Sequence, residues 1–274
     1  MRLSVTHLTR FLHSSGVSEE HMELRLRPPD GRGQRVISHH LDVRPESPVR
    51  SYVDGFGNHV QYFNLMPPHQ MLEIVSRAQV ETGLPSFPEA AELVPSDLLA
   101  FRPPVVDAPA VQRLARRARL REARSPVDTL QALDRILAAI ARELTYTTDV
   151  TTVSTNVEEV LELRRGVCQD FAHVFIAVSR AAGIPCRYVS GYVYAGSGEL
   201  VVGASHAWAE AWVPSRGWTA YDPTHAHLTP DHYVRLAVGR DYRDAAPTRG
   251  VFVGTAQSVM EASVEIGVAD LTAA

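Results

Sequence analysis

The stretch "GVCQDFAHVFIAVSRAAGIPCRYVSGY", residues 166–192, decides the fold and holds both cysteines of the 274-residue chain. Its apolar residues recur at the i, i+3, i+4, i+7 spacing of a helix with one buried face: Phe171, Val174, Phe175 and Val178. This spacing predicts a helix that begins at or near Cys168 and stops at Gly183. From Cys186 onward the pattern becomes that of strands.

The two cysteines have different expected surroundings. Cys168 is predicted in the first turn of the helix, where unpaired N–H groups and the helix macrodipole favour a thiolate over a thiol. Free cysteines are also common as small buried residues, so this position alone does not establish a nucleophile. Cys186 falls within an apolar strand pattern after "GIP", and we interpret it as a core residue.

A histidine and an aspartate follow in "SHAWAEAWVPSRGWTAYDPT", residues 205–224, which has the pattern of a hairpin. Side chains two residues apart in a strand share one face of the sheet. A hairpin centred on Pro214 pairs His206 with Asp222, and one centred on Ser215 leaves Asp222 diagonal to His206. Both registers put the imidazole and the carboxylate on one face, and only a centre between two residues separates them.

These three residue types form a constellation that can transfer an acyl group. We expect Cys168 to attack an acyl carbon, His206 to take and later donate a proton, and Asp222 to hold the imidazole in one tautomer. The backbone N–H of Cys168 is one expected oxyanion donor. The candidates for a second donor or for the cleft wall are Gln169, Tyr146 and Trp208.

Three segments of the chain resemble the signature segments of the bacterial transglutaminase-like superfamily, a papain-like group of thiol enzymes: residues 166–192, "HAWAEAWV" (206–213) and "GWTAYDPT" (217–224). The resemblance implies that Cys168, His206 and Asp222 are the catalytic triad. It implies an α+β fold, in which a papain-like transglutaminase core of helices packed on an antiparallel sheet follows a small β-sandwich. Members of the superfamily include crosslinkers, peptidases, amidases and inactive proteins, so the resemblance leaves the substrate open.

The chain is expected to have four parts: a β-rich N-terminal domain (1–85), a proline-rich linker (86–104), the transglutaminase-like core (105–245) and C-terminal strands that complete the fold (246–274). In the first part, alternating segments indicate strands, and "DGFGN" predicts a hairpin turn. In the core, Ser125 followed by Pro126 predicts the start of a long helix. Asn156 with Glu159 predicts a capping box and a short helix that ends before Gly166.

Composition limits the partners. The formal net charge is -4, and all 27 basic residues are arginine. We interpret the arginines of residues 109–124 as a solvated helix face, and we expect no nucleic-acid partner. No run of 18 apolar residues and no signal-peptide pattern occurs, so we expect no membrane partner and a cytoplasmic location. Two cysteines do not make a disulfide framework, which fits a reducing compartment.

The expected function is thiol-dependent acyl transfer on a peptide or amide substrate, with hydrolysis favoured over transamidation. The chain has no acidic cluster of the calcium-binding kind and no lysine to serve as its own acyl acceptor. The rival hypothesis from another class is a module that binds peptides or a partner without catalysis. We expect no cofactor and no metal, because we interpret the "THAH" pair His225 and His227 as loop residues. The oligomeric state stays open.

Overall fold

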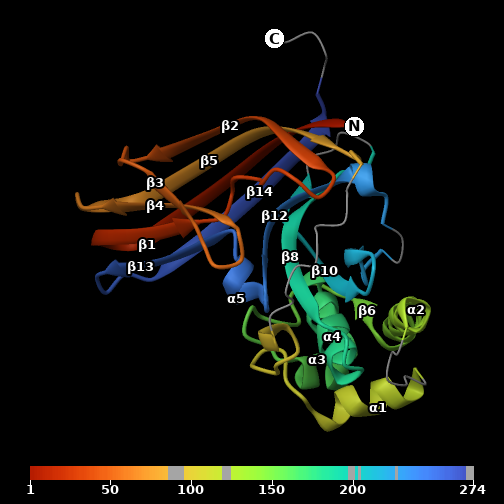
Figure 1. Cartoon of the computed structure of the whole chain (residues 1–274). Coiled ribbons are helices and arrows are strands. Elements are labelled where there is room, and N and C mark those ends of the chain that lie inside the picture. Colours follow the sequence, from red (N-terminus) through yellow and green to blue (C-terminus); the bar gives the residue numbers. More distant parts are fainter. Residues whose placement is uncertain (86–95, 119–124, 197–200, 203–204, 226–227, 270–274) are drawn as a thin grey trace.

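The computed structural model describes residues 1–85, 96–118, 125–196, 201–202, 205–225 and 228–269. It has two lobes, a β domain and a core in which helices pack against a second sheet (Figure 1). The predicted α+β class is therefore confirmed. In the parts of the chain so described, no helix combines the length and apolar character needed to cross a bilayer.

The β domain is built from eight strands of one hydrogen-bonded sheet, counted over the described residues. They are β1 (Arg2–Leu24), β2 (Gln34–Arg44), β3 (Arg50–Val53), β4 (His59–Leu65), β5 (His69–Thr82), β9 (Val201–Val202), β13 (Thr248–Val253) and β14 (Ser258–Val268). The first half of β1 pairs with β5 and β14, and its second half pairs with β4 and β13. One long strand thus takes part in both halves of the sheet, which forms a half-barrel.

The layers expected of a β-sandwich are the two halves of this single sheet. Leu72 and Ile74 of β5 and Phe63 of β4 belong to one buried cluster, to which Met22 and Leu24 of β1 also contribute. The C-terminal strands β13 and β14 pair with β1, so they complete the β domain and not the sheet of the core. The boundaries of the four predicted parts stay predictions, and most of the predicted linker lies outside the described residues.

The core surrounds the helix α4 (Cys168–Ala181), which is predicted from the opening segment and confirmed. Three more helices pack beside it: α1 (Pro109–Arg117), α2 (Pro126–Glu143) and α3 (Val157–Leu163). The antiparallel sheet runs in the order β11 (Gly217–Tyr221), β10 (His206–Val213), β8 (Cys186–Val193) and β12 (Tyr233–Gly239). The short elements are η1 (Ser96–Leu98), β6 (Thr145–Tyr146), β7 (Arg165–Gly166), η2 (Pro230–His232) and α5 (Tyr242–Ala245).

Local signals at the helix ends explain these boundaries. The Ser125 hydroxyl accepts from the backbone N–H of Asp128 at 3.1 Å, as expected for the N-cap of α2. Asn156 and Glu159 form the predicted capping box of α3. The predicted end of α3 before Gly166 is confirmed, because the chain leaves the helix at Arg164, whose φ of 56° is left-handed.

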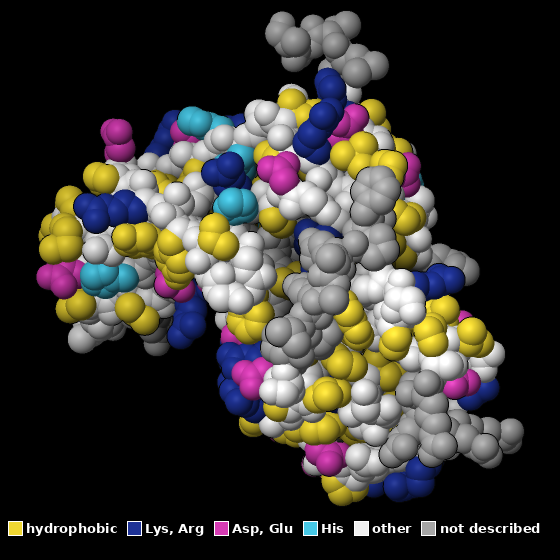
Figure 2. Space-filling model, in the orientation of Figure 1, with side chains coloured by type: hydrophobic (Ala, Val, Ile, Leu, Met, Phe, Trp, Pro, Cys, Tyr) yellow, Lys and Arg dark blue, Asp and Glu magenta, His cyan; other side chains and the backbone are white. Residues whose placement is uncertain are grey.

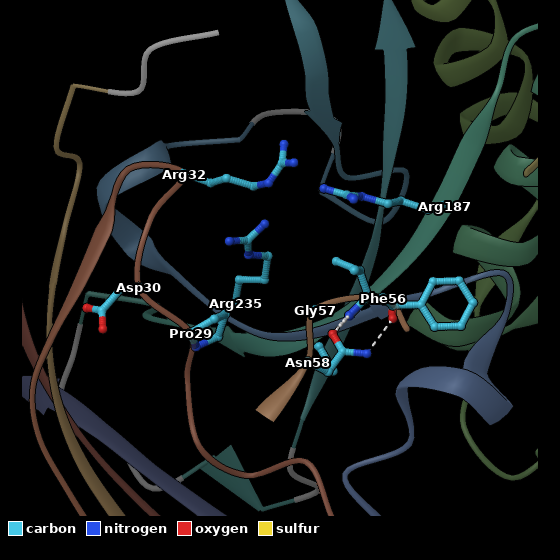
Figure 3. Close-up of a pocket in the computed structure, with 10 residues that line it drawn as sticks. Pro29, Asp30, Arg32, Phe56, Gly57, Asn58, Arg187 and Arg235 are labelled. Atoms are coloured by element: carbon cyan, nitrogen blue, oxygen red, sulfur yellow. Dashed lines mark hydrogen bonds between the residues drawn. The ribbon is translucent and has the colours of Figure 1, made fainter. Parts of the chain in front are cut away.

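Two amide side chains join the β domain to β12, an edge strand of the core sheet. Asn58, in the predicted hairpin turn between β3 and β4, accepts from the backbone N–H of Val238 and donates to its carbonyl, each at 2.8 Å (Figure 3). Gln34 makes the same pair of bonds with Arg235, at 2.9 and 3.0 Å. These bonds satisfy backbone groups that an edge strand otherwise leaves unpaired, and they fix the two lobes relative to each other.

A cavity lies at this junction and is lined by arginine side chains from both lobes. Arg32 belongs to the β domain, and Arg187 and Arg235 come from β8 and β12 (Figure 3). Arg187 donates twice to one carboxylate oxygen of the buried Glu210, at 2.6 and 2.8 Å. On the outer surface, acidic and basic side chains are interspersed over the face shown in Figure 2.

Candidate active site

The N-terminus of α4 places Cys168 at the edge of a cavity. Cys168 is the first residue of α4, and its side chain is partly exposed. The buried carboxylate of Asp170 accepts from the backbone N–H of Val167 at 2.8 Å and from the Thr151 hydroxyl at 2.7 Å. A Cβ on Gly166 would approach this carboxylate to 2.6 Å, so glycine is required there. Asp170 thus fixes the start of the helix that presents the thiol.

Sequence reasoning did not single out Asp170, although an acidic residue three positions after the N-cap is a recognisable signal. Burial raises its pKa, and the hydrogen bonds from Thr151 and Val167 oppose that shift. Its place next to the cysteine makes it a supporting residue of the site.

The hairpin of β10 and β11 brings His206 and Asp222 together. The pairs Ala209–Tyr221 and Trp212–Trp218 show that the hairpin is centred on Ser215, the second of the two predicted registers. His206 Nε2 lies 2.7 Å from Asp222 Oδ2. Because both side chains are buried, this contact is shielded from water.

The surroundings of His206 stabilise its charged form. Burial disfavours a charged imidazole, but hydrogen bonds and charges from Asp222 and Cys168 outweigh burial and raise the pKa of His206 to about 9. Since Nε2 bonds to Asp222, Nδ1 is the ring nitrogen left for the Cys168 thiol. The structure therefore brings the three predicted residues together: His206 bonds to Asp222, and Cys168 lines the same cavity as His206.

The Asp222 carboxylate has more partners than the sequence revealed. Oδ2 accepts from the hydroxyl of Tyr233 at 2.7 Å and contacts Nδ1 of His225 at 2.8 Å, in addition to its bond with His206. Oδ1 accepts from the backbone N–H of Thr224 at 2.8 Å. Burial opposes ionisation of Asp222, but these bonds and the charge of His206 hold the pKa of its carboxyl well below the usual range. It is therefore a fixed anion at neutral pH.

Replacing Tyr233 with phenylalanine is expected to slow turnover about tenfold, because one charged-acceptor hydrogen bond is removed from Asp222 while the ring is kept. The rate of p-nitrophenyl acetate hydrolysis measures the effect. Tyr52→Phe is the matched control, since its hydroxyl donates to Glu23 in the β domain, at 3.0 Å. An equal loss in both variants would rule out a specific role for the Tyr233 hydroxyl.

Cys168 and His206 open onto a cavity of about 350 Å³ whose wall comes from both lobes. His7 and Thr9 of β1 line it from the β domain, and both are buried polar residues. His7 is held by a hydrogen bond between its Nδ1 and the hydroxyl of Tyr192, at 2.8 Å. A molecule that reaches the thiol would therefore contact the β domain as well as the core.

The three secondary candidates lie in different places. Gln169 lines this cavity, and its Nε2 donates to the carbonyl of Val153 at 3.4 Å. Tyr146 is about half exposed and is outside the cavity lining, although burial and the nearby Cys168 charge raise its pKa. Trp208 lines a separate cavity with Tyr233, and its role at the cleft stays a prediction. Its indole packs beside His206, with ring centroids 6.1 Å apart.

The second cysteine and two further histidines were also considered from the sequence, and none of them joins Cys168, His206 and Asp222 in the described residues. Burial raises the pKa of Cys186 to about 12, so its thiol stays protonated. His173 is buried, and its Nε2 accepts from the backbone N–H of Tyr242 at 3.1 Å. His227, one half of the "THAH" pair, lies outside the described residues.

A cysteine at a helix N-terminus, packed on an antiparallel sheet that carries histidine and aspartate and joined to a half-barrel β domain, defines the class of transglutaminase-like proteins. The chain belongs to the transglutaminase-like superfamily, whose core matches residues 116–223. Residues 3–81 match the bacterial transglutaminase-like N-terminal region.

Several known proteins are similar to this chain, some over most of its length and others over a part of it. An uncharacterized protein of Mycobacterium leprae is 33% identical over 97% of this chain and 98% of its own length. A crystal structure of "a Putative Cysteine Protease from Cytophaga hutchinsonii" has a TM-score of 0.72 and 21% identity, and covers 100% of this chain and 94% of that one. A protein-glutamine gamma-glutamyltransferase of Pseudomonas aeruginosa is 39% identical over 24% of this chain and 11% of its own length.

Proposed function

We propose that the chain hydrolyses an amide bond through a thioester intermediate on Cys168. The observation that carries the proposal is the buried hydrogen bond between His206 and Asp222, beside a cavity that His206 and Cys168 both line. A nucleophile, a base within hydrogen-bond reach and a group that orients the base are the three parts that covalent catalysis requires.

In this proposal the Cys168 sulfur attacks the carbonyl carbon of the substrate, and the C–N bond then breaks. The His206 imidazolium donates its proton to the leaving amine, which departs neutral. A water molecule next attacks the thioester, the neutral His206 takes its proton, and the carboxylic acid leaves as the thiol is restored. The backbone N–H of Cys168 and the Gln169 side chain are the proposed donors to the oxyanion, because both residues begin α4 and line the cavity.

The second candidate is transfer of the acyl group to an amine in place of water. The observation behind this candidate is the Pseudomonas aeruginosa protein named a protein-glutamine gamma-glutamyltransferase, which aligns with about a quarter of this chain. The acceptor would come from another molecule, because the chain has no lysine. Adding a primary amine to the reaction separates the two: an amide product supports transfer, and the free acid alone supports hydrolysis.

A binding module on the same fold is the rival from a different class. It would use the cavity without forming a thioester, so reactivity of the thiol distinguishes it from an enzyme. The proposed substrate is a peptide or another amide. We also propose a cytoplasmic setting, which is supported by the two free cysteines, because a reducing compartment preserves free thiols.

Iodoacetamide at neutral pH is expected to alkylate Cys168 at least about a hundred times faster than Cys186. The first thiol is partly exposed beside His206, whereas the second is buried and stays protonated. Peptide mass spectrometry after timed quenching measures both rates in one sample, so Cys186 serves as an internal control. Slow and equal labelling of the two would contradict the proposed nucleophile.

A further inference from the structure

Three metal-ligating side chains meet inside the β domain, apart from the residues of the proposed active site. His13 and Glu20 come from β1, and His69 is the first residue of β5. Their relative exposures are 7%, 2% and 8%, so all three are more than nine-tenths buried. One ligand atom from each lies within 4.8 Å of the other two. Buried ionisable groups are costly unless something in the structure compensates for them.

The hydrogen bonds of His69 determine which of its nitrogens can act as a ligand. Its Nδ1 lies 2.9 Å from the carbonyl oxygen of Pro67, and a carbonyl only accepts, so Nδ1 carries a proton. A neutral His69 then presents the lone pair of Nε2, which lies 2.8 Å from Oε2 of Glu20. Two lone pairs at that distance repel each other unless a proton or a metal ion lies between them. A backbone bond at the far nitrogen is the usual support of a metal-bound histidine.

His13 provides the second, independent observation. Within the described residues, neither of its ring nitrogens has a hydrogen-bond partner, although both are buried. Its Nε2 lies 3.4 Å from Oε2 of Glu20, outside hydrogen-bonding geometry, and its ring packs edge-on against Phe252. A buried imidazole with no partner is unfavourable, and a metal ion would satisfy it.

We propose that Nε2 of His13, Nε2 of His69 and Oε2 of Glu20 bind one divalent zinc-class ion. Two imidazoles and a carboxylate suit zinc, and its bond lengths put tetrahedral ligand atoms about 3.3 Å apart. The distance of 3.4 Å between His13 and Glu20 already matches, and the 2.8 Å contact of His69 needs to open by about 0.5 Å. A water molecule would complete the coordination.

The position of the cluster indicates what the ion does. The pairing of β1 with β5 shifts register between Leu12 and Val17, and past this irregularity β1 takes β4 and β13 as its neighbours. His13 lies within this irregular segment, Glu20 follows it, and His69 pairs with Val17 at its end. The ion would therefore fasten the bend that converts a flat sheet into a half-barrel. This role is independent of the proposed function.

We expected no metal from the sequence, because no pattern in it points to the proposed site. Positions 13, 20 and 69 match no short ligand motif, and the irregularity in β1 that lets His13 and Glu20 converge has no local signature.

Metal analysis of the full-length, tag-free chain tests the proposal. After dialysis against Zn²⁺ and then metal-free buffer, we expect one zinc per chain in the unmodified protein and in His21→Ala, an exposed histidine of β1. His13→Ala and His69→Ala are expected to lose it. His225→Ala is a further control for binding at the His206, Asp222 and His225 cluster, and zinc retained there supports the β-domain site. No zinc in the unmodified chain, or zinc lost only in His225→Ala, would overturn the proposal.

A second measurement on the unmodified chain does not depend on the variants folding. Removing zinc with a chelator is expected to lower Tm by about 5 to 10 °C, and adding Zn²⁺ alone is expected to restore it. An unchanged Tm in both steps would show that no ion fastens the bend. In that case His69 carries a second proton and forms an ion pair with Glu20.

Discussion

The Cys168→Ala chain is expected to release no burst of p-nitrophenolate from p-nitrophenyl acetate, whereas the unmodified chain releases one equivalent per active site. Its steady-state rate is expected to fall about 10³-fold or more, to the uncatalysed background. The reason is that no other described thiol is reactive, because burial raises the pKa of Cys186 to about 12. Stopped-flow absorbance measures both the burst and the later rate.

Two variants make this result specific. Cys168 is only partly buried, so its truncation is expected to leave Tm nearly unchanged, which calorimetry can check. Cys186→Ala is the matched control, because it removes the core thiol and is expected to keep the full burst. A burst that persists in Cys168→Ala would show that another residue is the nucleophile.

Asp222→Asn is expected to slow turnover about 10²-fold or more and to change the titration of His206. In the unmodified chain the imidazole keeps its proton through neutral pH and loses it as pH rises through about 9. The amide cannot supply the negative charge that supports the imidazolium, whereas burial continues to disfavour it. The titration midpoint is therefore expected to drop below pH 7.

Nitrogen-15 NMR of the ring nitrogens measures that midpoint directly, and a Cys168→Ser background separates the contribution of the thiol. Asp42→Asn is the charge-matched control, since Asp42 is a partly exposed residue of β2 that pairs with Arg77. If both variants titrate like the unmodified chain, Asp222 does not govern the protonation of His206.

The helix and hairpin of the candidate site were predictable because their signals are local. The start of α4 at Cys168 follows from apolar spacing, and the shared face of His206 and Asp222 follows from strand parity. The sequence left two registers open. The structure adopts the one centred on Ser215, whose φ of 68° is left-handed, and nothing in "PSRG" distinguishes that turn from the alternative beforehand.

The partners that come from distant elements could not be predicted. Tyr233 reaches Asp222 only because β12 returns beside β8, and His7 lines the cavity only because β1 folds over the core. Strand parity puts Trp208 on the face of His206, but parity does not say which cavity that face borders. Such placements depend on pairings between segments far apart in sequence, for which neither periodicity nor capping leaves a trace.

The most direct test of the central claim is the mass of the chain during turnover. The protein is mixed with p-nitrophenyl acetate, quenched in acid within the burst, digested and analysed by tandem mass spectrometry. We expect one acetyl group per chain, attached to Cys168 and absent after the substrate is exhausted. An acetyl group on another residue, or an unmodified Cys168 throughout the burst, would contradict this expectation.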